Sequence, residues 1–447
     1  MGKRLEALTR KLSANRLILV IFIIVFGGVG GWFLVTSHAA TPTASVEPEN
    51  GLLASGASTV HDSTASGSDA VKFGITVTVP AQCANGGSYL WNNLETCGWP
   101  GPSNTGVDMS QCPGGLTNSS SLTITTADTV VSCKNISGGI DVEAQNVTIK
   151  NSVVSRNAAG AGGTGVIEIG DGASATVDRV EINGQDATHA CIFNSGSKGA
   201  TLQYSLVAKN VKCHDVNDGI FSWWWDQRTS YGGGSYFDTN ADAGSNFIIQ
   251  DSYFYDFTEG AANGHIDGYQ TEGAWNGTIT HNTYHMNRRA GDTDVDGGDM
   301  DSAIAIWNDF NSYKVAADGG TDKTVDNFTI SNNLFAGGGF TVYAEDRSPG
   351  GGAPSESSPV GGHEMTNIKV LNNKFSTYLE GGCVGEYGVW FYRGPLTNNP
   401  NLTWPPYNGG PTGDWGANGN IRSGNVVLET GENIDSDNPH EGSYLCH

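Results

Sequence analysis

Five short segments combine acidic, basic and aromatic residues with the alternating pattern of β-strands. Side chains on a strand point to opposite faces in turn, so an inward apolar set leaves a second set facing solvent. Carboxylates and histidines on such a face can transfer protons, and aromatic rings can stack on sugar rings. The segments therefore predict a surface that binds or cleaves a glycan. They are NDGIF at Asn217, HIDGYQ at His265, DSAIAIW at Asp301, FTVYAED at Phe340 and VWFYR at Val389.

Two Asp-Gly pairs supply the predicted catalytic centre. Aligning them places Asp218 beside Asp267 on neighbouring strands, with His265 on the same face. Arg347 and Arg393 are further candidates for a catalytic base. Asp-Gly pairs are also typical of turns, so a purely structural role for these residues stays open.

The remaining outward positions form a predicted substrate-binding strip. We expect the inward set to be Ile304 with Ile306, Phe340 with Val342, and Val389 with Phe391. The outward set then includes acids and aromatic residues that suit a glycan. Its members are Asp301, Trp307, Tyr343, Glu345, Trp390 and Tyr392.

A second candidate site is the acidic run DTDVDGGDMD, residues 292–301. Carboxylates at alternate positions followed by Gly can wrap a hard cation with oxygen ligands, although the final Glu of an EF-hand is missing. The run predicts a calcium site beside the strand that follows it, with a solvated acidic loop as the alternative. The predicted ligands are Asp292, Asp294, Asp296, Asp299 and Asp301.

A recurring eight-residue strand pattern positions these segments. Its third and eighth residues are apolar and should stack inward, and successive copies start between 25 and 51 residues apart. A short, irregular period of this kind indicates a solenoid with loop insertions of different lengths. The copies are VTIKNSVV from Val147, ATVDRVEI from Ala175, ATLQYSLV from Ala200, FIIQDSYF from Phe247, GTITHNTY from Gly277, FTISNNLF from Phe328 and IKVLNNKF from Ile368.

The fifth and sixth positions of the pattern are rich in Asn, Asp and Ser. These residues tolerate the left-handed or bent backbone that a corner between two strands requires. Examples are Asn151, Asp251, Asn332, Asn333, Asn372 and Asn373.

With these stacked columns and corners, the chain resembles the right-handed parallel β-helix of the pectate lyase-like superfamily, from about Ser121 to about Ile434. The resemblance implies an all-β fold. It implies lyases, hydrolases, epimerases or non-catalytic surface proteins as functions, because one fold serves many activities. The hydrolases of this superfamily carry Asn-Thr-Asp, Asp-Asp, Gly-His-Gly and Arg-Ile-Lys motifs, which do not occur here in order. A lyase is therefore favoured over a hydrolase.

The N-terminal region predicts export. Five basic residues precede the uncharged apolar run from Leu17 to Val35, which can span a bilayer with the later residues outside. Ser37-His38-Ala39 could be a cleavage site, so an uncleaved anchor and a secretory signal both stay open. The predicted organisation is a basic segment 1–16, a transmembrane or signal segment 17–35, a stalk 36–74, an N-terminal cap 75–120, a β-helix 121–434 and a tail 435–447. Within the stalk, Val46 to Gly74 resembles the opening strands of jelly-roll carbohydrate-binding modules.

All 8 cysteines follow the apolar run, and their even number predicts four disulfides in an oxidising compartment. Cys191 and Cys213 are about one coil apart, which makes them the best predicted pair. A structural zinc site would need a C-x-x-C spacing, which does not occur.

Charge restricts the partners. After residue 35 the chain holds 45 acids and 18 bases, so nucleic acid is not expected, and a polyuronate would be repelled unless cations intervene. Calcium-dependent lyases of the resembled superfamily use the ion to neutralise a uronate carboxylate before a base removes the adjacent proton. We expect a calcium-assisted polysaccharide lyase, with a non-catalytic glycan-binding or adhesion protein as the alternative. We also expect a monomer, because capping segments discourage pairing at the solenoid edge.

Overall fold

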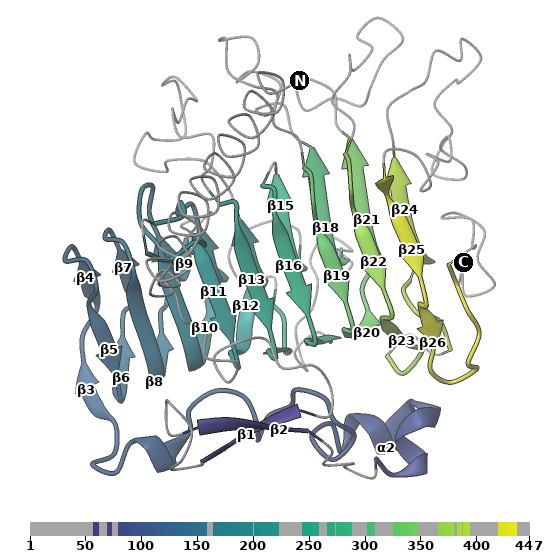
Figure 1. Ribbon diagram of the computed structural model, residues 1–447, viewed down its shortest axis with the longest axis horizontal. Coiled ribbons are helices and arrows are strands. Elements are labelled where there is room, and N and C mark those ends of the chain that lie inside the picture. Colours follow the sequence, from purple (N-terminus) through teal and green to yellow (C-terminus); the bar gives the residue numbers. More distant parts are fainter. Residues whose placement is uncertain are drawn as a thin grey trace, which may run out of the picture. The chain divides into compact units, whose positions relative to one another are not determined.

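A computed structural model describes fourteen stretches of the chain (Figure 1). The chain divides into two compact units, Met1–Thr78 and Val79–His447. In the first unit, β1 (Ala57–His61) and β2 (Asp69–Phe73) pair in antiparallel fashion. The described residues are 57–61, 69–73, 79–158, 164–199, 201–222, 244–258, 266–272, 274–287, 302–308, 325–346, 365–379, 382–386, 388–393 and 419–435.

The second unit is built from strands that stack in parallel from one coil to the next, as a β-helical solenoid requires (Figure 1). Three sheets result. Sheet 1 contains β5 (Val130–Ser132), the first part of β8 (Val147–Ser155), the first part of β10 (Ala175–Asn194), β11 (Leu206–Lys209), β13 (Phe247–Gln250), β16 (Gly277–Thr280), β19 (Thr329–Ser331), β22 (Lys369–Leu371) and β25 (Ile421–Ser423).

Sheet 2 follows sheet 1 around each coil. It contains β3 (Thr117–Ser119), β6 (Lys134–Ser137), later parts of β8 and β10, the start of β12 (Lys212–Ser222), β14 (Tyr253–Phe254), β17 (Thr283–Met286), β20 (Leu334–Gly337), β23 (Lys374–Ser376) and β26 (Val426–Val427).

Sheet 3 contains the segments that carry the predicted chemistry. Its strands are β4 (Leu122–Ile124), β7 (Ile140–Val142), β9 (Gly165–Ile169), the ends of β10 and β12, β15 (Asp267–Glu272), β18 (Ser302–Asn308), β21 (Phe340–Asp346) and β24 (Gly388–Arg393). The parallel, all-β architecture expected from the repeated pattern is confirmed.

The predicted inward columns form the core in six of the seven copies, where the third and eighth residues are buried. The strand predicted to start at Ala200 was placed wrongly. Ala175 pairs with Leu206, so the strand of this coil starts six residues later, and Cys213 takes the inward place assigned to Val207. The left-handed residue Asn210 (φ 51°) fixes that register, because it forms the corner that Asn151 forms two coils earlier.

In the six correct copies the fifth position is the corner between sheets 1 and 2, as predicted. Its residues have positive φ, and the neighbouring sixth residue turns into the interior. There the side chains of Asn282, Asn333, Asn373 and Asn425 form a buried ladder. The Nδ2 of each of the first three asparagines donates to the Oδ1 of the asparagine in the next coil, at 3.0–3.1 Å. At the last coil the Nδ2 of Asn425 donates to Asp435.

A stack of aromatic rings fills the core beside this ladder. Phe254 lies on Tyr284 with 4.7 Å between ring centroids, and Tyr284 lies 5.4 Å from Phe335. Phe375 continues the stack and meets the edge of Trp390 at 5.2 Å. Such contacts between coils add to the stabilisation from burial itself.

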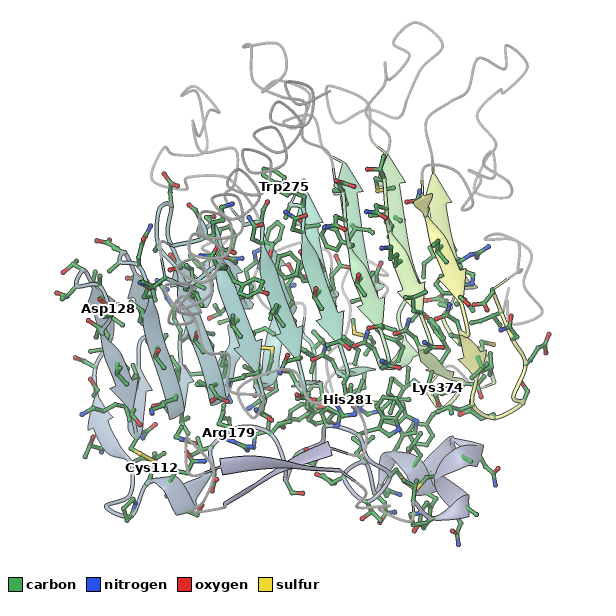
Figure 2. All side chains as sticks on the ribbon, viewed as in Figure 1. Cys112, Asp128, Arg179, Trp275, His281 and Lys374 are labelled. Atoms are coloured by element: carbon green, nitrogen blue, oxygen red, sulfur yellow. A yellow bond between two sulfur atoms is a disulfide. The ribbon has the colours of Figure 1, made fainter. Side chains whose placement is uncertain are left out.

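Residues 81–112, here called the strap, run along the side of the solenoid. The strap contains η2 (Ala81–Asn85), α2 (Gly87–Trp91) and η3 (Met109–Gln111). The Gly87 N–H donates to Glu429 in the last coil, and Gly106 N–H donates to Asn210 in the middle. Figure 2 labels Cys112, His281 and Lys374 on the side that the strap follows. We expected 75–120 to cap the open end. The strap instead covers a lateral face, because Trp91 and Leu90 find apolar partners there, and β3 further along the same segment joins sheet 2.

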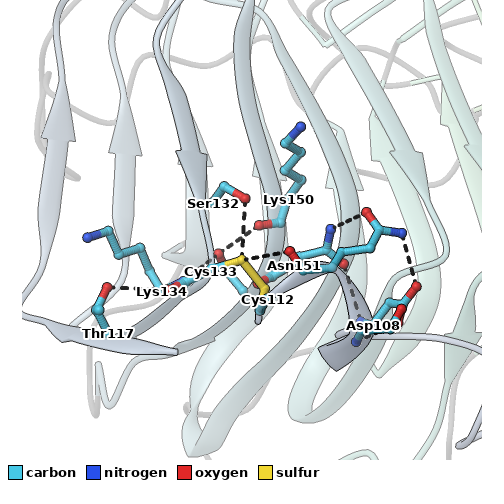
Figure 3. Close-up of a disulfide and its surroundings, with 11 residues drawn as sticks. Asp108, Cys112, Thr117, Ser132, Cys133, Lys134, Lys150 and Asn151 are labelled. Carbon is cyan, nitrogen blue, oxygen red and sulfur yellow. Dashed lines mark hydrogen bonds between the residues drawn. A yellow bond between two sulfur atoms is a disulfide. The ribbon is translucent and has the colours of Figure 1, made fainter. Parts of the chain in front are cut away.

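A disulfide lies at each end of the strap. Cys83 pairs with Cys97 inside the strap, and Cys112 pairs with Cys133 at the corner of the first coil (Figure 3). Next to that bond, Asn151 Nδ2 donates to Gln111 and Asp108 N–H donates to Asn151. The predicted bond between Cys191 and Cys213 is confirmed. Cys383 is also disulfide-bonded, to a residue outside the described part.

Within the described residues, no helix is long and apolar enough to cross a membrane. The predicted span 17–35 lies outside them.

Candidate functional site

The candidate site lies on two neighbouring strands of sheet 3, at the start of β15 and beside it on β12. The pairing of Ile220 with Tyr269 places Asp218 opposite Asp267, as predicted. The Asp267 N–H donates to Asp218 Oδ1 at 3.0 Å. Both side chains are fully buried, so the prediction that they are exposed to solvent is wrong. Asp267 makes a further interaction as well.

The two carboxylates nevertheless face away from the apolar core. A Cβ added to Gly219 would meet Phe254, and one added to Gly268 would meet Tyr284. Both aromatic rings belong to the core stack, so the glycines face inward. Asp218 pairs in register with Ala190, which packs with Phe193 and Phe221 apart from the main core, so Asp218 and its neighbour Asp267 face outward. Glycine is required because the core ring leaves no room for a side chain.

His189 from β10 joins this pair, although the sequence analysis did not select it. Its Nε2 lies 3.2 Å from Asp218 Oδ2, and its side chain is 16% exposed. The ring meets Phe221 edge-on, with 5.5 Å between centroids. Burial alone would lower the pKa of His189, but the Asp218 carboxylate outweighs burial and raises it. The signal that could have found His189 is the Ile-Phe pair shared by HACIF and NDGIF, which aligns Ile192 with Ile220.

An aromatic and amide column continues the same face across sheet 3. Phe193 packs edge-on against Phe221 at 5.3 Å. In register, Phe221 pairs with Gln270, then follow Ala305, Tyr343 and Phe391. Tyr343 is half-buried on this face, and its predicted binding role stays a prediction. Phe391 is the register partner of Tyr343, and its side chain is not described.

Trp390 was predicted to face the substrate, and this is wrong. Its register partner is the core residue Val342, its side chain is 1% exposed, and its Nε1 donates to Ile434 O at 3.1 Å. The pairing with Val342 turns Trp390 into the core, where Val389 also lies as predicted. Phe340 is half-buried rather than part of the core, and Ala303, which alternation from Asp301 would place outside, lies in the core.

Other predicted site residues are placed only in part. Trp307, Glu345 and Arg393 share one register column on β18, β21 and β24, and Tyr392 lies opposite Ala344. The side chains of these four residues are not described. His265, Arg347, Asp292, Asp294, Asp296, Asp299 and Asp301 lie outside the described residues. In the described part of the chain, no group of three His, Cys, Asp or Glu residues could hold a metal ion.

A second titratable cluster lies on the outer face of sheet 2. Lys212 Nζ contacts Glu181 Oε2 at 2.6 Å, and the His214 ring lies between Glu181 and Asp215. The hydrogen bond from His214, with Lys212 beside it, lowers the pKa of Glu181 to about 2. Asn183 Nδ2 donates to Asp215 at 3.0 Å. The charges of this cluster are largely satisfied by one another, which is typical of a structural network.

Comparison with models of protein families finds none that matches the chain, and comparison with curated proteins finds no similar sequence.

Proposed function

We propose that the chain is an extracytoplasmic carbohydrate-active protein with the right-handed β-helix of the pectate lyase-like superfamily, and that it cleaves a polysaccharide by calcium-assisted β-elimination. The observation that carries this proposal is the outward pair Asp218 and Asp267, fully buried on neighbouring strands, with His189 against one of them. Burying two carboxylates side by side is costly for folding. Such a cost is typical of sites kept for chemistry.

The calcium site would be the acidic run 292–301. Asp301 directly precedes Ser302, and Ser302 pairs with Asp267 in the next coil. The run therefore ends beside the carboxylate pair. Bound calcium would neutralise the substrate carboxylate and make the neighbouring C–H proton more acidic. A cation is also needed for attraction, since the chain after residue 35 carries 45 acids against 18 bases.

Export is supported by the cysteines. The described residues contain three complete disulfides and no free cysteine. Such bonds persist in oxidising compartments. The apolar run 17–35 would anchor the protein in the cell membrane, or would be removed on secretion.

The test is incubation of the full-length protein with polyuronates and neutral glycans, with calcium or with a chelator. Absorbance of unsaturated products and new reducing ends are followed in parallel. We expect unsaturated product that disappears with the chelator and falls by about 100-fold or more in Asp267→Asn. Asp178→Asn, which removes a carboxylate paired with Lys209 on sheet 1, is the matched control and should leave the rate unchanged.

Each other outcome has a definite meaning. New reducing ends without unsaturated product would replace the lyase with a hydrolase. Retention of a glycan without any cleavage would favour the non-catalytic glycan-binding or adhesion protein. Neither binding nor cleavage would refute a carbohydrate-directed function.

A further inference from the structure

We propose that His189, oriented by Asp218, is the base that removes the substrate proton, an inference that rests on the proposed function. His189 is preferred over the candidates His265, Arg347 and Arg393 because its ring contacts Asp218 through Nε2 and its Nδ1 makes no hydrogen bond within the described part of the chain.

The Asp218 carboxylate fixes both the position and the tautomer of the His189 ring. Asp218 Oδ1 accepts the Asp267 N–H, which holds the carboxylate in place. Its Oδ2 lies 3.2 Å from His189 Nε2. Because a carboxylate only accepts hydrogen bonds, the neutral ring carries its proton on Nε2. The lone pair of a neutral His189 is therefore on Nδ1.

Nδ1 remains available for chemistry. It is a buried atom with no hydrogen-bond partner among the residues that the structure describes. A buried polar atom without a partner costs roughly 1–3 kcal/mol, so a bound ligand that hydrogen-bonds Nδ1 removes this cost. The arrangement matches the general pattern in which a third group orients the base.

Another carboxylate-paired histidine provides the contrast. His281 Nδ1 lies 2.6 Å from Asp251 Oδ1, and its Nε2 lies 2.9 Å from the carbonyl oxygen of Gly98 in the strap. Both ring nitrogens of His281 are therefore occupied by the fold. His189 has the same type of carboxylate partner but only one occupied nitrogen.

The proposed step balances without a redox partner. Neutral His189 takes the proton from the carbon next to the uronate carboxyl group, and the electrons of that C–H bond form a carbon–carbon double bond. The bond from the adjacent carbon to the glycosidic oxygen breaks, and this oxygen takes a proton from water. The His189 imidazolium, stabilised by Asp218, then returns its proton to solvent.

The charge environment gives a signature in the pH profile. Asp218 from β12 is the charged group that acts on the ring, Phe221 from the same strand is uncharged, and Thr188 and Ala190 flank the ring on β10. Asp218 raises the pKa of His189, so the rate should rise with pH along a limb above the ordinary histidine value of about 6.5. In Asp218→Asn only the effect of burial remains, and the limb should move to lower pH.

The experiment measures kcat, KM and pH profiles of the full-length protein on the polyuronate it cleaves. We expect His189→Gln to lower kcat by about 100-fold or more with little change in KM. His281→Gln is the matched control and should keep the kcat of the unmodified chain. In Asp218→Asn we expect the rising limb of kcat to move below that of the unmodified chain.

Two results would overturn the inference separately from the proposed function. Retention of kcat within threefold in folded His189→Gln would exclude His189 as the base and leave the lyase intact. A rising limb of the pH profile that does not move in Asp218→Asn would also exclude His189 as the base and leave the lyase intact. This test does not depend on whether His189→Gln folds. A protein that cleaves none of the polyuronates would overturn the lyase and the role of His189 together.

Discussion

The strap side of the solenoid and the outer face of sheet 3 both contain partly buried histidines, but the histidines have different partners. On the strap side, His285 lies 4.8 Å from Trp91 in a stacked arrangement, and His281 binds Asp251 and Gly98. On sheet 3, His189 binds Asp218 through one nitrogen only. The strap therefore uses histidine to attach one segment to another. On sheet 3, His189 Nδ1 has no hydrogen-bond partner among the residues that the structure describes, which leaves it available to a ligand.

The difference shows why residue type alone does not identify a site. Histidine, carboxylate and aromatic residues occur on both faces. What separates His189 from His281 is whether the second ring nitrogen is satisfied within the fold, and what separates it from His285, whose buried Nε2 also lacks a partner, is the carboxylate at its other nitrogen. We expect changes on the strap side to alter stability and changes on the sheet 3 side to alter activity.

The largest stability effect should come from Trp91→Ala. Trp91 is 9% exposed, stacks on both His285 and Tyr378, and donates from Nε1 to Ser376 Oγ at 3.0 Å. Its loss should lower the free energy of unfolding by about 3–5 kcal/mol, measured by chemical denaturation. Tyr89→Ala, in the same helix but 38% exposed, should change it by less than about 0.5 kcal/mol. Equal effects of the two variants would mean that the strap contributes little to stability.

The next effect is the pH dependence that His285 adds to the strap side. Burial lowers the pKa of His285 from 6.5 to about 4. Between these two values the unfolded chain binds more protons than the folded chain, so the unfolding free energy falls as the pH falls from 6.5 to 4. The loss attributable to His285 should reach about 3 kcal/mol.

His285→Phe isolates this contribution. The variant keeps a ring against Trp91 but cannot be protonated, so its stability should fall less between pH 6.5 and 4 than that of the unmodified chain. Denaturation curves at several pH values measure the difference. Parallel pH dependences for the two proteins would exclude His285 as the cause.

The buried asparagine ladder gives a smaller effect that is independent of pH. Asn333 Nδ2 donates to Asn373 Oδ1 and to Ile279 O, and its Oδ1 accepts from the backbone and side chain of Asn282. Asn333→Ala leaves these partners unsatisfied and should cost about 2–3 kcal/mol. The exposed Asn118→Ala is the control and should be nearly neutral. A neutral Asn333→Ala would mean that water replaces the missing amide.

These particular residues also explain what the sequence could predict. The six correct copies of the pattern were found because apolar residues recur at fixed distances from a corner residue. The pairing of Asp218 with Asp267 followed because both precede a glycine that the core ring requires. Neither inference needs contacts between residues far apart in the chain.

The errors have the opposite origin. The copy at Ala200 and the orientation of Trp390 were wrong because a shift of the register moves a strand's residues to other positions or faces. In each case a pairing with a neighbouring coil fixes the register. The strap was placed at the wrong surface because its partners, such as Glu429, lie hundreds of residues away. His189 was missed because HACIF lacks the Asp-Gly pair that marked the other coils.

The smallest stability effect, and the sharpest test of the comparison, should come from Asp218→Asn. The amide oxygen can still accept the Asp267 N–H, and the amide NH2 can donate to His189 Nε2 once the neutral ring carries its proton on Nδ1. The exchange also relieves the cost of burying a charge. We expect the free energy of unfolding to change by less than about 1 kcal/mol, while the reaction loses its normal pH profile.

The same exchange at Asp435 is the matched control. Asp435 accepts hydrogen bonds from Gly424 N–H and from the N–H and Nδ2 of Asn425 at the end of the ladder. An amide at this position can accept through only one atom, so Asp435→Asn should cost about 2 kcal/mol. If Asp218→Asn proved as destabilising as Asp435→Asn, the carboxylate on sheet 3 would be a structural element, and the distinction between the two faces would fail.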